Sequence, residues 1–310
     1  MRIEAGYDIA FTCPQEVPMV LMLSVHPSRQ KDLLTEHRIS FSPDVIARDY
    51  LDAFGNVCTR LVAPPGLLEV RNRFEIFDSG MPDEIAPGAV QHDVRDLPDD
   101  ALVYLIGSRY CDTQKLDKLA WGLFGHIQSG WQRVQAICDY VHTRIQFGYH
   151  LARCDRTASE GHLERIGVCR DFAHLAIALC RCMNIPARYC TGYLGDIGVP
   201  RDPAPMDFSA WFEVFLGDRW YTFDARHNHP RIGRIVIAQG RDAAEVAIST
   251  SFGPAYLTKF AVFTEQAPSH DTVAPHLAPA LSALPSREVA LPPPRMSMTD
   301  IDGGARTWEP

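Results

Sequence analysis

The amino-acid sequence predicts an α+β protein, in which a β-rich N-terminal domain precedes a core of helices followed by strands. Residues 1–95 hold short runs of β-forming residues that Pro and Gly interrupt. From about residue 112, apolar residues recur with the 3.6-residue period of helices. After about residue 187 short strands return, and helices followed by consecutive strands are typical of an α+β fold rather than alternating βαβ units.

In the N-terminal domain, residues 1–95, turn-forming stretches at 54–56 and 63–66 separate the expected strands. No cluster of catalytic residue types lies there, so we expect a structural or binding role. Residues 96–111 are interpreted as a connection to the core. The strands are expected at residues 7–12, 19–25, 39–42, 57–62 and 67–77.

The core is expected to span residues 112–265. The periodicity predicts a first helix over 116–127, a second that Ser129 starts as its N-cap, and a third over 169–184 that Pro186 ends. The strands are expected at residues 187–194, 208–216, 219–224, 231–238 and 256–264.

The C-terminal segment, residues 266–310, is rich in Pro, Ala and Ser and shows no sustained period. Such a composition predicts a tail that packs extended or stays disordered.

The composition narrows the classes of partner and cofactor. The net charge is −8 and no run of Lys and Arg occurs, so we expect no nucleic-acid partner. No apolar run reaches the roughly 20 residues of a membrane span, so no membrane partner is expected. Nine cysteines without metal spacing indicate neither a metal site nor a cofactor, and acidic residues near the N-terminus argue against a signal peptide. These features predict a cytoplasmic protein with reduced cysteines, and its oligomeric state stays open.

Cys169 is the first candidate functional residue. It stands where the third helix is expected to begin, within the sequence Gly-Val-Cys-Arg-Asp-Phe. Unpaired N–H groups and the positive end of the helix dipole stabilise an anion there, which favours a thiolate nucleophile. Buried, inert cysteines are the more frequent kind in proteins, but the helix start distinguishes Cys169 from the other eight.

Two strands after this helix form a predicted hairpin that ends at a carboxylate. If Gly217 and Asp218 form a two-residue loop, the register places Trp211 opposite Asp224, and Ser209 becomes a diagonal neighbour of Asp224 on one face. Diagonal neighbours lie roughly 7–8 Å apart at Cα.

These motifs resemble those of the transglutaminase-like superfamily, over about residues 110–265, and the β-rich region looks like the N-terminal domain of bacterial members. The resemblance implies a papain-like core, a peptide or protein substrate, and a thioester at Cys169 formed from a peptide or glutamine amide. Asp224 would orient the general base. Hydrolysis and cross-linking both stay open. The motifs are those around Cys169, Asn-Ile-Pro-Ala-Arg-Tyr at 184–189 with Gly192 and Tyr193, and Ala-Trp-Phe-Glu at 210–213 followed by Phe223 and Asp224.

The sequence departs from the family pattern at Ser209, where the resemblance implies a histidine that acts as the base. A serine side chain does not span the gap to Asp224, and serine is no base at neutral pH. Losing a general base typically lowers a rate by about 10²–10⁴-fold. The alternative function is therefore a catalytically impaired pseudoenzyme that binds a peptide or protein in the same cleft.

His227 is a further candidate base. In an extended strand it would lie roughly 10 Å beyond Asp224 on the opposite face. Only an early exit from the strand, for which Pro230 gives some reason, would bring its imidazole to the site. His174 is expected to be a packing residue, and nothing in their spacing places His142 or His150 at the site.

Overall fold

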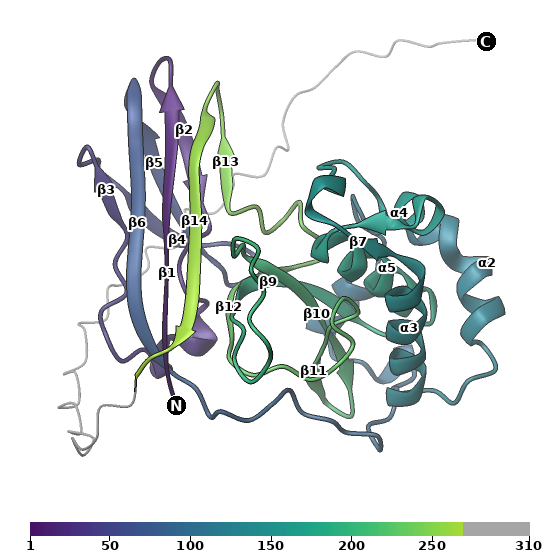
Figure 1. Ribbon diagram of the computed structural model, residues 1–310. Coiled ribbons are helices and arrows are strands. Elements are labelled where there is room, and N and C mark those ends of the chain that lie inside the picture. Colours follow the sequence, from purple (N-terminus) through teal and green to yellow (C-terminus); the bar gives the residue numbers. More distant parts are fainter. Residues whose placement is uncertain (269–310) are drawn as a thin grey trace, which may run out of the picture. The chain divides into compact units, whose positions relative to one another are not determined.

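The computed structural model describes residues 1–268, and the segment after Pro268, which holds most of the expected tail, lies outside the described residues. The described part combines antiparallel sheets with a group of helices (Figure 1), so the predicted α+β class is confirmed. None of the helices in residues 1–268 has the length and apolar character needed to cross a membrane.

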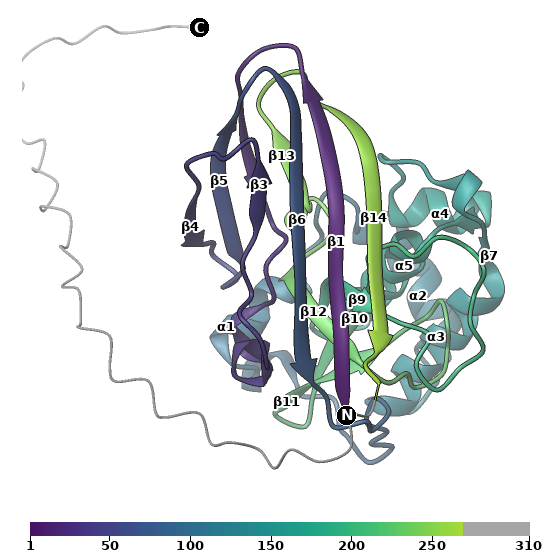
Figure 2. The ribbon, with the colours of Figure 1, turned by 60° about the vertical axis from the view of Figure 1, so that its left-hand side comes forward.

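Two four-stranded antiparallel sheets make up most of the N-terminal region (Figure 2). Their long strands alternate buried and exposed residues, as expected where one face of a sheet is packed. The first sheet has the order β14-β1-β6-β3, with β14 Tyr256–Gln266, β1 Arg2–Cys13, β6 Gly66–Phe77 and β3 Ser40–Ser42; the second has the order β13-β2-β5-β4, with β13 Ser249–Ser251, β2 Val17–Leu21, β5 Val57–Ala63 and β4 Arg48–Leu51.

The last strands of the described chain return to these two sheets. β14 pairs with β1 along its whole length, and β13 pairs with β2. The strand expected at 256–264 therefore exists, but its partner lies in the N-terminal region rather than among the strands of the core. The expected domain boundaries stay a prediction, and this pairing adds that the chain crosses between the two regions more than once.

The core packs helices against a third antiparallel sheet of order β11-β10-β9-β12. Helix α5 is buried on nearly all sides, which explains the uninterrupted apolar run at residues 175–180. The elements are α1 Asp99–Leu102, α2 Thr113–Phe124, α3 Trp131–Arg144, β7 Gln146–Phe147, α4 Ala158–Glu164, β8 Ile166–Gly167, α5 Cys169–Cys182, β9 Ala187–Leu194, β10 Ser209–Leu216, β11 Arg219–Phe223 and β12 Arg234–Gly240.

The start of α3 differs from the prediction. Gly130, not Ser129, is the N-cap residue, with φ of 93°. A Cβ at Gly130 would lie 2.5 Å from the carbonyl oxygen of Ala89, so only glycine fits this close approach.

The hairpin between β10 and β11 has the predicted register, with Leu216 opposite Arg219. Gly217 and Asp218 both have positive φ, 52° and 67°, as a two-residue hairpin loop requires. β11 ends at Phe223, and the next strand starts only at Arg234, three residues later than expected. The chain between these strands forms part of the candidate site.

Candidate active site

Cys169 is the first residue of α5, where it is partly buried at the wall of a cavity of about 880 Å³. The loop 195–207 and residues 262–266 of β14 contribute to the same wall. The cavity thus brings together side chains from the helix, the third sheet and the N-terminal region. Its polar lining residues include Ser209, Asp207, Arg226 and His227.

Asp171 caps the start of α5. Its Oδ2 accepts a 2.8 Å hydrogen bond from the N–H of Val168, while its own N–H donates to Val168 O at 2.8 Å. A Cβ at Gly167 would lie 2.6 Å from the Cβ of Asp171. The Gly-Val-Cys-Arg-Asp motif is therefore a compact cap that holds Cys169 at the helix end.

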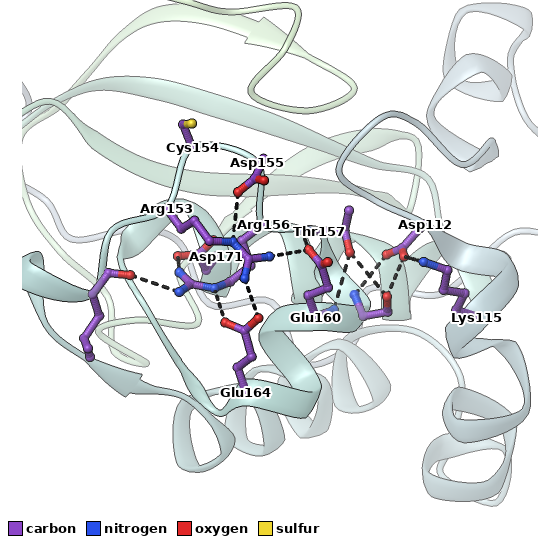
Figure 3. Close-up of polar contacts among 12 residues, drawn as sticks. Asp112, Lys115, Arg153, Cys154, Asp155, Arg156, Thr157, Glu160, Glu164 and Asp171 are labelled. Atoms are coloured by element: carbon purple, nitrogen blue, oxygen red, sulfur yellow. Dashed lines mark hydrogen bonds and ion pairs between the residues drawn. The ribbon is translucent and has the colours of Figure 1, made fainter.

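Arg156 ties this cap to the preceding segment. Figure 3 shows its guanidinium between Asp171 and Glu164, with Nη1 donating to Asp171 Oδ2 at 2.9 Å and Nε to Glu164 Oε2 at 2.9 Å. Nη2 donates to Leu151 O at 3.0 Å. No sequence pattern marks Arg156, because its partners come together only in the folded chain.

Helix α4 presents the carboxylates of this cluster. Thr157 and Glu160 form a capping box at its N-terminus, and this Thr-x-x-Glu spacing is the sequence signal that could have predicted the helix. Arg153 pairs with Glu160 and Glu164 at 2.6 Å each (Figure 3). The segment before α5 is thereby held as one charged unit against the start of the helix.

The thiol of Cys169 is neutral at physiological pH. Burial raises its pKa to about 11, which the guanidinium of Arg226 and the N–H of Ala210 oppose and the carboxylate of Asp207 reinforces. The expectation that the helix start favours a thiolate is corrected here, because desolvation has the larger effect. Activation of Cys169 therefore requires a base.

Asp224 follows β11 and is buried. Its Oδ1 accepts hydrogen bonds from the N–H groups of Arg226 and His227, both at 3.0 Å. Its Oδ2 accepts from His227 Nδ1 at 2.8 Å and from Arg234 Nη2 at 3.0 Å. Burial by itself would raise the pKa of Asp224, but Arg234 and His227 outweigh it and hold the pKa far below its usual range. Asp224 is therefore an anion that accepts four hydrogen bonds.

His227 reaches Asp224 because the chain leaves the strand at Phe223. The N–H of Asn228 donates to Asp224 O at 2.8 Å, which closes a tight turn, and Asn228 has φ of 55°. The imidazole thus lies next to Asp224 rather than roughly 10 Å along an extended strand. The early exit that the sequence analysis required for His227 is present.

Helix α3 holds this turn through hydrogen bonds of two of its side chains. His142 Nδ1 donates to Arg226 O at 2.9 Å, and Asp139 accepts from Asn228 Nδ2 at 2.8 Å. The spacing of His142 in the sequence gave no reason to place it at the site. Its part is to hold the turn that carries His227.

Arg234 extends the site toward the N-terminal region. Its Nε donates to both oxygens of Asp83 at 3.0 and 2.9 Å, and its guanidinium lies 5.0 Å from the centre of the Trp211 ring. Asp83 also accepts from the N–H of Arg231 at 2.9 Å. No local sequence signal marks Asp83 or Arg234, since 151 residues separate them along the chain.

Ser209 begins β10 opposite Gly192 and lines the cavity. Its hydroxyl is buried and has no hydrogen-bond partner among the described residues.

His174 is fully buried in α5 and accepts a hydrogen bond from the N–H of Ala243 at 3.1 Å, as expected for a packing residue. His150 is exposed. Within residues 1–268, no group of three His, Cys, Asp or Glu side chains is arranged to hold a metal ion.

Comparison with known proteins identifies similar sequences and folds. The family model for the transglutaminase-like superfamily matches residues 118–225, which include Cys169, Ser209 and Asp224. The crystal structure of a proposed cysteine protease from Cytophaga hutchinsonii is 30% identical, with a TM-score of 0.71, and the match covers 88% of this chain and 92% of that chain. An uncharacterized protein of Mycobacterium leprae is 33% identical over 88 residues, a match that spans 26% of this chain and only 30% of that protein.

Proposed function

Because the chain belongs to the transglutaminase-like superfamily, we propose that it is a cysteine enzyme that acts on peptide or glutamine amides through a thioester at Cys169. In this proposal His227 is the general base, in place of the histidine that Ser209 replaces, and Asp224 orients it. The observation that carries the proposal is the 2.8 Å contact of His227 Nδ1 with Asp224, since His227 and Cys169 line one cavity.

The hydrogen bond to Asp224 determines which ring nitrogen acts as the base. Because Nδ1–H donates to the carboxylate, Nε2 carries the lone pair. A neutral thiol with a pKa of about 11 loses its proton to Nε2 as sulfur attacks the carbonyl carbon. The permanently charged Asp224 then stabilises the imidazolium that forms.

The reaction continues by acyl transfer. The C–N bond breaks, the leaving amine takes the proton from His227, and the acyl group stays on sulfur as a thioester. Water or a second amine then attacks the carbonyl carbon of the thioester and gives its proton to His227. The C–S bond breaks, the product leaves, and the sulfur takes the proton back from His227, which regenerates the Cys169 thiol. The N–H of Cys169, at the first position of α5, has no acceptor within the helix and supplies a donor for the oxyanion.

Ser209 supports the second candidate function, a pseudoenzyme that binds a peptide or protein without turnover. Its hydroxyl, which has no hydrogen-bond partner within residues 1–268, occupies the position where the family pattern has a histidine, and the Cys169 thiol on the wall of the same cavity is neutral. In that case the cavity would retain its binding role after losing catalysis.

The test uses the full chain, with hydrolysis of p-nitrophenyl acetate and incorporation of dansylcadaverine into β-casein as readouts. Cys169→Ala should abolish both activities. His227→Gln should lower kcat/KM by about 10²–10⁴-fold. The matched control is His126→Gln, an exposed histidine that does not line the cavity, and it should change nothing. Full activity of His227→Gln would refute the base assignment, and wild type without Cys169-dependent turnover would favour the pseudoenzyme.

A further inference from the structure

The second sheet of the N-terminal region carries a cavity of about 680 Å³ on its outer face, and this cavity shares no lining residue with the candidate active site. Cavities of roughly 300–1,000 Å³ are usual for small-ligand sites. Strands β2 and β5 bury Met19 and Leu61, so the residues that alternate with these face outward. The side chains that line the cavity include Pro18, Val20, Arg48, Tyr50, Arg60 and Phe252.

Two arginines are adjacent on this face. Arg48 in the terminal strand β4 lies directly opposite Arg60 in β5. Directly opposite side chains share a face, with Cβ atoms roughly 4.5–5.5 Å apart, and like charges in such a pair destabilise the sheet. Neither arginine forms an ion pair within residues 1–268. The carboxylate of Asp49 accepts from Thr59 Oγ1 at 2.7 Å, on the opposite face of the sheet. The charges of the two arginines are therefore not neutralised.

The first sheet treats its cations differently. Each Arg or Lys on its four strands has a carboxylate partner, whereas the two cations on the strands of the second sheet have none among the described residues. Acidic side chains are not scarce, since the chain has 38 of them against 30 basic ones. The unpaired arginines thus indicate a ligand that brings its own negative charge. The ion pairs of the first sheet are Arg2–Glu75 at 3.7 Å, Arg71–Asp8 at 3.1 Å, Lys259–Asp8 at 2.6 Å and Arg73–Glu4.

Apolar side chains surround the two arginines. Val20 lies directly opposite Arg60 on the β2 side. Tyr50 follows Arg48 by two residues in β4 and therefore shares its face. The side chains of Tyr50 and Phe252 are 46% and 67% exposed, so their rings are available to a ligand. Apolar walls with a few converging polar groups are typical of small-molecule sites. The cavity therefore fits a ligand with an anionic group and an apolar body.

We propose that this cavity binds a small organic phosphate, whose phosphate group pairs with the guanidinium groups of Arg48 and Arg60. The apolar body of the ligand packs on Val20, Tyr50 and Phe252. Guanidinium groups match phosphate oxygens in geometry, and a phosphate monoester carries about two negative charges at neutral pH, which neutralise both cations. This site is independent of the proposed function, because neither Cys169 nor His227 contributes to it.

The first experiment compares two probes by isothermal titration calorimetry on the full chain. α-Naphthyl phosphate and α-naphthol have the same ring system, and only the first is an anion at neutral pH. Wild type should bind the phosphate at least about tenfold more tightly, because charge-assisted hydrogen bonds are the strong ones. Equal affinities for the two probes, or no binding of the phosphate, would overturn the proposal.

Variants then assign the difference to the arginine pair. Arg48→Gln and Arg60→Gln should each weaken binding of α-naphthyl phosphate about tenfold and leave α-naphthol unchanged. The matched control is Arg71→Gln, which removes an exposed but ion-paired arginine from the first sheet and should change neither affinity. Unchanged phosphate binding in both cavity variants would show that the probe binds elsewhere, against the proposal.

Two further variants locate the apolar body of the probe. Phe252→Ala should weaken both probes to a similar extent, because its ring contacts the part that they share. Cys169→Ala should bind both like wild type, since Cys169 lines the other cavity. The proposal fails if Phe252→Ala has no effect or if Cys169→Ala loses the phosphate.

Urea unfolding distinguishes a binding role from a structural one. Because like charges lie opposite each other, Arg60→Gln should keep or raise the midpoint of unfolding. A lower midpoint would mean that the folded state needs the arginine pair, and the pair would then be structural.

Anionic membranes offer the same chemical group. The net charge of −8 disfavours binding to them, so phosphatidylcholine vesicles that contain phosphatidic acid should not cosediment with the protein. Cosedimentation that Arg60→Gln abolishes would identify a lipid head group as the ligand and contradict the proposal of a small organic phosphate.

Discussion

Two buried carboxylates, Asp171 on the helix side of the candidate site and Asp224 on the strand side, both pair with a buried arginine. The Arg156 Nη1 to Asp171 Oδ2 distance is 2.9 Å, and the Arg234 Nη2 to Asp224 Oδ2 distance is 3.0 Å. Yet the pKa of Asp171 is raised and that of Asp224 is lowered. Burial raises both values, so the other contacts decide the direction.

The difference lies in the number of donors around each carboxylate. Asp171 accepts hydrogen bonds only at Oδ2, from Val168 and Arg156; its buried Oδ1 accepts none among the described residues and lies 3.9 Å from Arg170 Nη2. Asp224 uses both oxygens for four donors. For Asp171, hydrogen bonds from one backbone N–H and from Arg156 and the longer contact with Arg170 do not offset desolvation, whereas an arginine, two backbone N–H groups and an imidazole do so for Asp224. Asp224 is therefore suited to hold a charge beside His227, and Asp171 to hold the backbone.

The largest expected effect concerns activity. Asp224→Asn should lower kcat/KM on p-nitrophenyl acetate by about 10²–10⁴-fold, because His227 loses the anion that orients and stabilises it. Asp171→Asn should lower it by less than about tenfold, since an amide oxygen still accepts from Val168. If the two variants lose kcat/KM equally, the two carboxylates do not differ in function, and both have a purely structural role.

Position 209, where the serine hydroxyl has no hydrogen-bond partner among the described residues, allows a test by restoring activity with a histidine. In the His227→Gln variant, Ser209→His should increase the remaining activity at least about tenfold, because an imidazole again reaches the cavity and Asp224 is free to orient it. Ser209→Gln in the same background is the control and should restore nothing. Restored activity would show that Asp224 can orient an imidazole at either position 209 or position 227.

A comparison of Arg156 with Arg153 tests whether burial or the number of ion pairs determines how much an arginine contributes to stability. The side chain of Arg156 is 3% exposed, and that of Arg153 is 38% exposed although it pairs with three carboxylates. Arg156→Met should lower the free energy of unfolding by about 3–5 kcal/mol, because Asp171 is left buried without its cation. Arg153→Met should lower it much less, because ion pairs of an exposed side chain are screened by solvent. Urea unfolding of both variants measures the difference, and a reversed order would contradict it.

The opposite pKa shifts predict opposite pH dependences of stability. An aspartate ordinarily titrates near pH ~3.9. The lowered pKa of Asp224 stabilises the folded state above that pH, and the contribution is lost as the pH falls below it. The raised pKa of Asp171 makes its ionisation destabilising as the pH rises through the same range. From pH 3 to 6, the stability of wild type should therefore rise relative to Asp224→Asn and fall relative to Asp171→Asn in urea titrations. If the stability of wild type and of both variants changes in parallel with pH, the opposite pKa shifts of Asp224 and Asp171 are refuted.

The last prediction concerns the reactivity of the Cys169 thiol. With a pKa of about 11, the rate of Cys169 alkylation by iodoacetamide should increase about tenfold per pH unit between pH 7 and 10. Peptide mass mapping separates it from Cys154, which is exposed. A rate that is already maximal at pH 6 would show that the helix end outweighs burial after all.

Local patterns in the sequence determined the fold class, the helix that starts at Cys169 and the hairpin that leads to Asp224. The reason is that each depends on residues close together in the chain. Gly217 and Asp218 set the hairpin register through their own positive φ values, and Asp171 caps a helix three residues from Val168.

Tertiary structure alone decided the features that join distant segments. His227 meets Asp224 in a turn that α3 supports, Arg234 pairs with Asp83 from the N-terminal region, and β14 finds its partner in β1. The pKa of Cys169 belongs to the same group, because the sequence indicates a helix end, whereas burial depends on everything that packs around the thiol. Such contacts depend on which surfaces remain to be buried once the local elements have formed, and no short stretch of sequence carries that information.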